Sequence, residues 1–324
     1  MTTIAIIGAG LAGTTLANSL SDRAAVRVFE KSRGIGGRMA TRYAGIFEFD
    51  HGAQYFSVRT EAFRQSLQPL IANGIVSEWN GKVVSLSANN GATQIERSDP
   101  IYVASPRMNA LPKHLADGLD VNVRCEIANV VPSNNGQWQL VDSEGGTHGP
   151  FDWVVSAAPS VQTSRLLPES ISFAGHLTSV QMAGCFSVLL GFDERPDVDW
   201  EGAKVTDSPI GWIAVNSEKP GRKSSPSVIV QTTNAWAEEN LERDPDEVSQ
   251  IIMDELTQLT GIDVGNAKHN SRHRWRYAHT PVPAGNDCLI DKGARLAACG
   301  DWCIGGRVEH AFTSAKALAA QLPV

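Results

Sequence analysis

The stretch "IAIIGAGLAG", residues 4–13, consists of an apolar run followed directly by a glycine-rich turn. An uninterrupted apolar run of this kind is typical of a strand in a parallel sheet that is covered on both faces. Gly8, Gly10 and Gly13 then form the pattern G-x-G-x-x-G, and leucines at helical spacing follow. The stretch therefore predicts the strand, turn and helix that begin a Rossmann-type dinucleotide-binding domain.

Each position of this pattern has a physical role in binding a dinucleotide. Gly8 permits the tight turn, Gly10 lets a pyrophosphate approach the backbone, and Gly13 lets the helix and the strand pack closely. The first N–H groups of the helix, at Leu11 and Ala12, have no partner inside the helix and carry a partial positive charge. We therefore expect the phosphates at this helix N-terminus.

A second glycine cluster follows the next strand, within "FEKSRGIGGRMATR", residues 29–42. Glu30 ends that strand, where its carboxylate accepts the ribose hydroxyls and disfavours NADP. An NAD dehydrogenase needs only one phosphate loop, whereas the longer, branched FAD offers its pyrophosphate to a second group of donors. Gly36 and Gly37 would allow close backbone approach, and Arg38 would donate charge-assisted hydrogen bonds. FAD is therefore favoured over NAD, which argues against an NAD-dependent dehydrogenase.

This second cluster resembles the flavin-containing amine oxidases, in which the second strand is followed by "EKS" and then by two glycines and a basic residue. The segment "LAACGDWCIGGRVEHAFTSAKALAAQL", residues 296–322, is similar to the closing motif of that family. The resemblance implies that Asp301 hydrogen-bonds the ribityl chain or the pyrophosphate and that the backbone N–H of Val308 meets the flavin O2 edge. A helix N-terminus at that edge would stabilise the negative charge of reduced flavin. Further implied cofactor contacts are Lys31, Gly37, Gln54, Ile127 at the adenine, Ala157 near the pyrophosphate, Gly300 and Gly306.

Three shorter stretches resemble the renalases and the bacterial renalase-like proteins, a group within this family. They are "DHGAQYF" (50–56), "WRYA" (275–278) and "VEHAFTSA" (308–315). Renalases oxidise dihydronicotinamide isomers, in which the ring carries its hydride at the 2 or 6 position. The resemblance thus implies an FAD-dependent oxidase of 2- or 6-dihydro-NAD(P). Hydride would pass to flavin N5, and reoxidation by O2 would give H2O2 and NAD(P)+.

This chemistry calls for positioning groups rather than a general base, because the ring regains aromaticity when it loses hydride. The donor carbon needs to lie about 3–3.5 Å from the acceptor. By the resemblance we expect Gln54 and Tyr55 beside the flavin. Trp275, Arg276 and Tyr277 are expected to stack on or hydrogen-bond the nicotinamide carboxamide and the ribose phosphates.

Arg307 departs from the amine oxidase pattern, which commonly has an aromatic residue at this position as half of a cage for a neutral amine. A cation here disfavours a protonated amine and suits an anionic or amide-bearing substrate. His51 and His310 flank the same region, and either a structural role or a role near the flavin is open to both. An amine oxidase or a desaturase-like dehydrogenase is the alternative activity, and a non-catalytic FAD-binding module is the remaining one.

The composition excludes several other classes of protein. The net charge of −7 argues against nucleic acid or an anionic membrane as the main partner. The five cysteines form neither a disulfide framework nor a metal-binding set, so we expect no metal site, and none lies in a recognised context for covalent flavin attachment. A predicted strand begins within three residues of Met1 and no apolar run approaches about 20 residues. We therefore expect noncovalent FAD in a cytoplasmic protein.

The order of the predicted elements indicates two interleaved domains in an α/β fold. A three-layer, Rossmann-type FAD-binding domain with a mostly parallel sheet is expected from residues 1–58, 102–160 and 286–324. An inserted α+β substrate domain on a mixed or antiparallel sheet is expected from residues 59–101 and 161–285. Predicted helices include 60–72, capped by Thr60, the helix that follows Asp244 and ends at Gly261, and a closing helix over 308–321.

Overall fold

The apolar run of residues 4–13 forms β1 (Thr3–Ile7), which lies inside a six-stranded sheet in the computed structural model. The structure describes residues 1–89 and 91–324. Five strands of this sheet run parallel and one edge strand is antiparallel. In spatial order they are β10 (Asp120–Val123), β2 (Ala25–Glu30), β1, β14 (Trp153–Ser156), β21 (Leu296–Ala298) and β20 (Leu289–Asp291).

Alternation along β1 explains how the sheet acquires a core on each face. Ile4 and Ile6 pack with two helices, α1 (Leu11–Leu20) and α8 (Val308–Gln321). Ala5 and Ile7 pack toward a second, antiparallel sheet and two short helices on the opposite face. That layer comprises β11 (Ile127–Pro132), β12 (Trp138–Asp142), β13 (Thr147–Phe151), α4 (Ser160–Leu166) and α5 (Ala174–Ser179). The predicted three-layer, Rossmann-type arrangement is confirmed.

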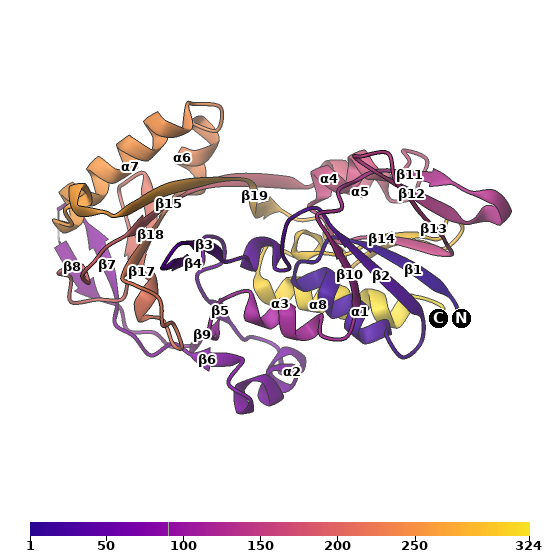
Figure 1. Ribbon diagram of the computed structural model, residues 1–324, viewed down its shortest axis with the longest axis horizontal. Coiled ribbons are helices and arrows are strands. Elements are labelled where there is room, and N and C mark those ends of the chain that lie inside the picture. The colour runs from indigo at the N-terminus through magenta and orange to yellow at the C-terminus, as the bar shows by residue number, and fades with distance from the viewer. Residues whose placement is uncertain (90) are drawn as a thin grey trace.

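A seven-stranded sheet forms the other lobe of the molecule, on the left of Figure 1. Its pairs are antiparallel except for β16 with β7, so the sheet is mixed, as predicted. In order the strands are β19 (His269–Val282), β15 (Gln181–Gly191), β18 (Ser227–Thr232), β17 (Ile210–Val215), β16 (Gly202–Val205), β7 (Val83–Ser87) and β8 (Gly91–Gln94). One face of the sheet is covered by α6 (Asn234–Glu239) and α7 (Pro245–Thr260), which the figure shows above it.

The predicted helix boundaries have the expected caps. The Asp244 carboxylate accepts from the backbone N–H groups of Asp246 and Glu247 at the start of α7, and Gly261 ends that helix with a φ of 73°. The Thr60 hydroxyl accepts from the backbone N–H of Phe63 at the start of α2 (Glu61–Ala72). These local signals are strong because a helix end leaves backbone groups that only a few residue types can satisfy.

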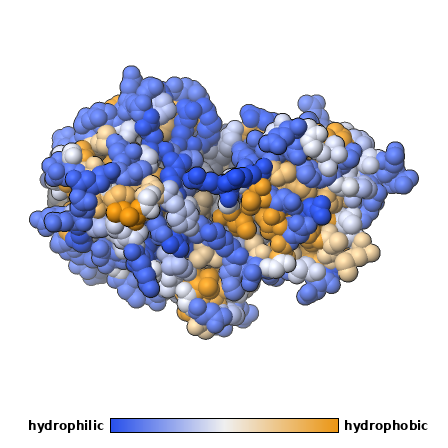
Figure 2. All heavy atoms as spheres, viewed as in Figure 1, coloured by the Kyte–Doolittle hydropathy of each residue, from blue (hydrophilic) through white to orange (hydrophobic). Residues whose placement is uncertain are grey.

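Small sheets lie between the two large ones. The hairpin β3 (Arg42–Ala44) and β4 (Phe47–Phe49) lies between the lobes in Figure 1. A second small sheet pairs β5 (Phe56–Ser57), β9 (Ile101–Ala104) and β6 (Val76–Glu78), and α3 (Ala110–Leu115) follows it in the chain. Figure 2 shows that the molecule narrows between the lobes, that hydrophilic residues cover most of the left lobe, and that hydrophobic residues gather on the right lobe beside the narrowing.

The strands of the two large sheets come from different parts of the chain. Every strand of the six-stranded sheet lies in 1–58, 102–160 or 286–324, and every strand of the seven-stranded sheet lies in 59–101 or 161–285. The small sheet of β5, β9 and β6 draws on both groups of segments. We keep the two-domain division as a proposal on this basis. Throughout the described residues, each helix is too short or too polar to cross a bilayer.

Candidate active site

The two glycine clusters lie directly against each other at the N-terminus of α1. The backbone N–H of Gly36 donates to the Ala9 carbonyl at 3.0 Å, and Gly10 and Gly36 form an isolated parallel bridge. A Cβ added at Gly37, where φ is +54°, would lie only 3.0 Å from the Gly10 Cα. Glycine at position 37 is thus required for the two clusters to lie in contact. Together the clusters bring two stretches of backbone to the same helix end.

Gly13 determines how closely α1 packs on β1. A Cβ at this position would lie 1.9 Å from the Gly8 carbonyl oxygen, which no side chain can accommodate without movement of the backbone. The helix has Gly10 as its N-cap and no side-chain cap. Its first N–H groups, at Leu11 and Ala12, therefore have no side-chain oxygen to satisfy them and can donate to an anion.

Glu30 is 6% exposed at the end of β2, beside the first glycine turn. One carboxylate oxygen accepts from the Ala9 N–H at 2.8 Å, and the other accepts from the Ser32 N–H at 2.8 Å. The carboxylate is therefore held in a fixed orientation by the turn itself. Lys31, the next residue, is exposed.

The remaining residues expected at the adenine and the pyrophosphate lie at the same end of the sheet. Ile127 is buried at the start of β11, and Cys125, two residues earlier, donates its N–H to the Glu30 carbonyl at 2.9 Å. Ala157 follows β14 and donates its N–H to the Ile7 carbonyl at 2.8 Å. Its carbonyl lies 3.3 Å from the Cβ position of Gly8, so it forms one wall of the glycine turn.

Arg38 forms a two-pronged ion pair with Asp301. One contact, from Nη1 to Oδ2, is 2.9 Å long, and the other joins Nη2 to Oδ1. Asp301 is buried, and the Arg38 side chain is 28% exposed. The pair connects the second glycine cluster to the C-terminal motif. It also occupies two of the five N–H groups of the guanidinium and leaves three for another ligand.

The turn between Asp301 and α8 depends on two glycines. The Asp301 carbonyl accepts from the N–H groups of Gly305 at 2.8 Å and of Gly306 at 3.1 Å, and Gly306 has a φ of +79°. At the start of α8, the His310 Nδ1 accepts from the Arg307 N–H at 3.4 Å. Burial and the Arg307 charge lower the pKa of His310. His310 therefore has a structural contact at the helix N-terminus.

Arg307, at the start of α8, and Tyr55, just before β5, have exposed side chains. Arg307 makes no ion pair with the described residues, and Tyr55 is 38% exposed. The Tyr55 ring lies 5.1 Å from the ring of Trp212 and 6.4 Å from that of Trp79. The helix α8 packs against β5, which directly follows Tyr55.

The stretch "DHGAQYF" is held by side chains of the seven-stranded sheet. The His51 carbonyl accepts from the Ser187 hydroxyl and from the Trp275 indole N–H, each at 2.8 Å. The Gly52 carbonyl accepts from the Gln231 amide at 2.8 Å. These three donors lie on β15, β18 and β19, so this stretch is anchored to the seven-stranded sheet.

Asp50 and Arg222 form an ion pair in which each side chain is 1% exposed, with Nη2 to Oδ2 at 2.6 Å. Burial alone would raise the pKa of Asp50, but the charges of Arg222 and Lys219 outweigh it and the pKa is lowered. The Lys219 Nζ donates to the Gln54 Oε1 at 2.9 Å. Burial lowers the pKa of Lys219 to about 7, against the opposing effect of Asp50.

The polar groups of Gln54 and Trp275 form hydrogen bonds within the protein. The Gln54 amide nitrogen donates to the carbonyls of Asp50 at 2.6 Å and Gly52 at 3.0 Å, while its oxygen accepts from Lys219. The Trp275 indole N–H donates to the His51 carbonyl. Both residues therefore orient the 50–54 segment. Tyr277 is half-buried two residues further along β19.

Arg276 does not join this group, contrary to our expectation. Its guanidinium forms a two-pronged pair with the exposed Glu242 carboxylate, and Arg274 lies near the same carboxylate. Side chains two residues apart share a face of a strand, and neighbours point to opposite faces. Arg276 thus lies on the side opposite Trp275, and we withdraw it as a substrate-positioning residue.

His51, His273 and Trp275 form a compact group of rings. The ring centroids are 4.8 Å apart for His51 with His273 and 4.2 Å apart for His273 with Trp275. Burial, followed by nearby His273 and Arg42, lowers the pKa of His51 to about 3. Burial and Arg42 lower the pKa of His273 to about 4. Both imidazoles are therefore neutral at physiological pH.

Sequence reasoning missed Asp50, Lys219, Arg222 and Glu309 as buried charged residues. The Glu309 carboxylate accepts from the Arg59 N–H at 2.8 Å and from the Thr60 N–H at 2.7 Å, which joins the starts of α8 and α2. Lys219 and Arg222 lie in a segment that reads as a polar loop, "SEKPGRKSSP". No local signal marks them as buried, because their partner is Asp50, 172 residues away from Arg222.

The chain belongs to the flavin containing amine oxidoreductase family, whose model matches residues 86–323, and an NAD(P)-binding Rossmann-like domain model matches residues 6–69. Within this family it is a renalase-like member. It is 23% identical over 302 residues to the renalase of Mus musculus, covering 86% of this chain and 85% of that protein.

Solved structures of the same fold extend over almost the whole chain. A putative protoporphyrinogen oxidase from Exiguobacterium sp. 255-15 has a TM-score of 0.77 and 11% identity, covering 99% of this chain and 98% of that one. Wild-type putrescine oxidase bound to putrescine has a TM-score of 0.73 and 12% identity, with 99% and 98% covered. At these identities the likeness establishes the fold alone.

The family implies a flavin cofactor, and the residues present fit one. The two glycine clusters expose backbone at a helix N-terminus, where a Cβ at Gly37 would close against Gly10. Glu30 lies beside this turn with a fixed carboxylate, and Arg38 retains N–H groups beyond its pair with Asp301. A phosphate-bearing dinucleotide matches this set of donors and acceptors.

Proposed function

We propose that this protein is an oxidase with noncovalently bound FAD that acts on dihydronicotinamide isomers, namely 2- or 6-dihydro-NAD(P). The observation that supports this most is the likeness to a renalase over most of both chains, in a sequence with Arg307 at the start of α8. The chemistry that FAD supplies is acceptance of a hydride at N5 and transfer of two electrons to O2, which yields H2O2.

Arg307 would bind the phosphates of the substrate. Its side chain is exposed and makes no ion pair with the described residues, so its charge is available to an anionic ligand. The same charge would repel a protonated amine. Tyr55 would pack against the substrate ring with the support of Trp212 at 5.1 Å. Neither role involves proton transfer, which suits a substrate that becomes aromatic when it loses hydride.

The groups around residues 50–54 would orient the site without acting as bases. Gln54 is locked by three hydrogen bonds, and His51 is neutral because burial lowers its pKa to about 3. The arrangement thus provides fixed positioning groups rather than an acid–base pair. Rigid placement of the donor carbon is sufficient for hydride transfer.

The test is the visible spectrum of the purified, flavin-loaded protein under anaerobic conditions. We expect 6-dihydro-NAD or 2-dihydro-NAD to bleach the flavin within seconds, while putrescine and other simple amines leave the spectrum unchanged. Ordinary 4-dihydro-NAD is the matched control, because it differs only in the position of the hydride. Rapid bleaching by an amine with no response to the isomers would favour an amine oxidase and overturn the proposal.

A second measurement tests the cofactor assignment. Acid precipitation of the purified protein should release all of the yellow colour into the supernatant, where the nucleotide is identified as FAD by chromatography. Colour retained on the precipitate would contradict noncovalent binding.

A further inference from the structure

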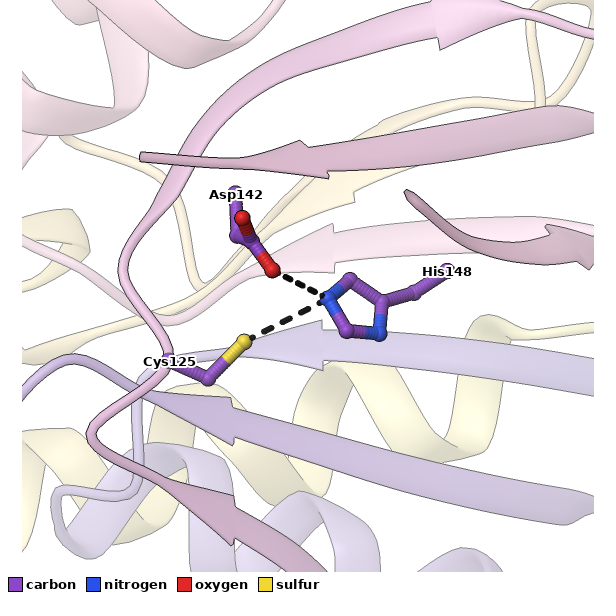
Figure 3. Close-up of side chains that lie close together, drawn as sticks. All are labelled: Cys125, Asp142 and His148. Atoms are coloured by element: carbon purple, nitrogen blue, oxygen red, sulfur yellow. Dashed lines mark hydrogen bonds and ion pairs between the residues drawn. The ribbon is translucent and has the colours of Figure 1, made fainter. Parts of the chain in front are cut away.

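A cluster of three potential metal ligands lies on the antiparallel sheet that covers the nucleotide-binding sheet, apart from the side chains assigned to the cofactor and the substrate. Cys125 precedes β11, Asp142 ends β12, and His148 lies in β13. Strand register brings them together, because Ile127 pairs with Asp142 and Leu140 pairs with His148. Figure 3 shows the three side chains pointing toward one another.

The contacts of His148 cannot all be good hydrogen bonds at once. Its Nε2 lies 2.8 Å from the Asp142 Oδ2 and 3.5 Å from the Cys125 Sγ, and the three ligand atoms all lie within 4.8 Å of one another. If Nε2 carries a proton, it donates to the carboxylate and cannot accept from the thiol. If Nε2 is unprotonated, it accepts from the thiol and faces the carboxylate oxygen with its lone pair. A single cation would satisfy the lone pairs of all three atoms.

We propose that Cys125, Asp142 and His148 bind one Zn²⁺ ion, with water as the fourth ligand. A thiolate, an imidazole and a carboxylate are a ligand set that zinc accepts and that the hard cations Mg²⁺ and Ca²⁺ do not. Ideal zinc distances at tetrahedral angles place such donor atoms about 3.4–3.6 Å apart. The Sγ–Nε2 separation of 3.5 Å already matches, and the Nε2–Oδ2 separation of 2.8 Å needs to widen by about 0.6 Å.

The surroundings hold the ligands in place as supporting groups of metal sites do. The second oxygen of Asp142, Oδ1, accepts from the N–H groups of Glu144 at 3.0 Å and Gly146 at 2.7 Å, which leaves Oδ2 for the ion. A Cβ at Gly146 would lie 2.5 Å from Oδ2, so only glycine leaves that oxygen uncovered. The ring of Phe29 packs against the imidazole at 5.1 Å.

The site is accessible but shielded. The side chains of His148 and Asp142 are 25% and 15% exposed. Cys125 is bonded through its N–H to the Glu30 carbonyl at the end of β2. A bound ion would therefore join the hairpin of β12 and β13 to the segment that follows the nucleotide-binding strand, and we expect it to stabilise the protein. The spacing of the cysteines in the sequence does not predict this site, since strand register assembles it.

The test is zinc binding by the flavin-loaded protein after dialysis against a chelator and then into metal-free buffer. Equilibrium dialysis with Zn²⁺ followed by elemental analysis should give one tight zinc ion per chain and a raised midpoint of thermal unfolding. Cys125→Ser and His148→Gln should each weaken this binding at least tenfold. Cys288→Ser is the matched control, because it removes another half-buried thiol and should leave binding unchanged.

Two results would overturn the proposal. One is the absence of tight zinc binding by the wild-type protein. The other is equal binding by the wild type and Cys125→Ser, which would assign the zinc to other residues. Unchanged flavin content and circular dichroism in each variant distinguish loss of the ligand from loss of the fold. The outcome is independent of the enzyme's substrate, since activity is not the readout.

Discussion

The two glycine clusters and the contact between the lobes are stabilised by different kinds of groups, backbone in the first and charged side chains in the second. At the N-terminus of α1, the first backbone N–H groups have no side-chain cap, and the buried Glu30 carboxylate is held by backbone donors. The contact between the lobes, which we call the seam, comprises residues 48–54 and 216–222. It contains three buried charged side chains, Asp50, Lys219 and Arg222. The glycine region thus depends on backbone shape, and the seam depends on charge balance.

The comparison teaches that the two regions should fail under different changes. A turn built from glycines is disrupted by any added side chain but is insensitive to pH. A seam built from buried charges tolerates shape changes at its edge, but its stability falls when one partner is removed and varies with pH when a buried group changes its protonation. Substitutions and pH can therefore separate them.

Removal of the Asp50 carboxylate should have the largest effect on stability. Asp50→Ala leaves Arg222 and Lys219 buried without their anion, and we expect a loss of about 3–5 kcal/mol in the free energy of unfolding. Denaturant unfolding followed by tryptophan fluorescence measures it. Asp199→Ala is the control, because the Asp199–Lys82 pair is exposed. Its midpoint should stay close to the wild-type value. Equal losses in the two variants would contradict a special role for the seam.

Lys219 should make stability rise with pH. Its pKa is about 7 in the folded protein and 10.5 in the unfolded chain, so between these values the unfolded chain binds one more proton. Stability then increases by up to about 1.4 kcal/mol per pH unit in this window, and below pH 7 the lysine is protonated in both states and contributes no slope. Unfolding of wild type and Lys219→Met at pH 7, 8 and 9 tests this.

The quantity to compare is the difference in the free energy of unfolding between wild type and Lys219→Met, because the other groups titrate equally in both proteins. We expect it to grow by about 2–3 kcal/mol in favour of the wild type from pH 7 to pH 9. A difference that does not change with pH would mean that Lys219 keeps its proton in the folded state.

A methyl group at Gly13 should disrupt the other region. In Gly13→Ala the Cβ meets the Gly8 carbonyl oxygen at 1.9 Å, so the helix must shift away from the strand. We expect a loss of about 1–3 kcal/mol in stability and at least a tenfold weaker retention of flavin. Gly34→Ala is the control in the neighbouring loop, since nothing lies within 4 Å of its Cβ position. Flavin absorbance per chain after gel filtration provides the measurement.

Arg307 should affect substrate binding alone. Arg307→Ala removes an exposed cation, so we expect an unchanged midpoint of unfolding and a rise of roughly 5- to 20-fold in KM for the dihydronucleotide, with kcat little altered. Arg307→Lys should recover most of the loss. Arg33→Ala, at another exposed arginine, is the control. A fall in kcat at unchanged KM would refute the role in substrate binding.

Patterns confined to short segments predicted the nucleotide-binding sheet and several helix ends. The glycines, the Asp244 cap and the Gly261 terminator act through their own backbone or that of near neighbours, so their meaning survives in a linear sequence. Neighbouring side chains of a strand point to opposite faces. "WRYA" suggested one functional group, yet the strand places Arg276 opposite Trp275.

The seam could not be predicted because its partners are distant in sequence. In the sequence, Lys219 and Arg222 look like residues of a solvated loop. In the structure they follow β17, and they bond to Gln54 and Asp50 respectively. Glu309 likewise looks like a surface residue near the start of a helix, yet it accepts three hydrogen bonds at the start of α2. Whether a charged side chain can be buried depends on the partners that surround it, and these partners are known only from the tertiary structure.

The Arg38–Asp301 pair joins positions 263 residues apart, and β14 pairs with β1 on one side and with β21 on the other. Synthesis must therefore pass residue 301 before these partners can meet. Contacts of such separation form late and slowly. We expect nascent chains shorter than this to be colourless and to acquire flavin only once the segment around Asp301 has joined the sheet.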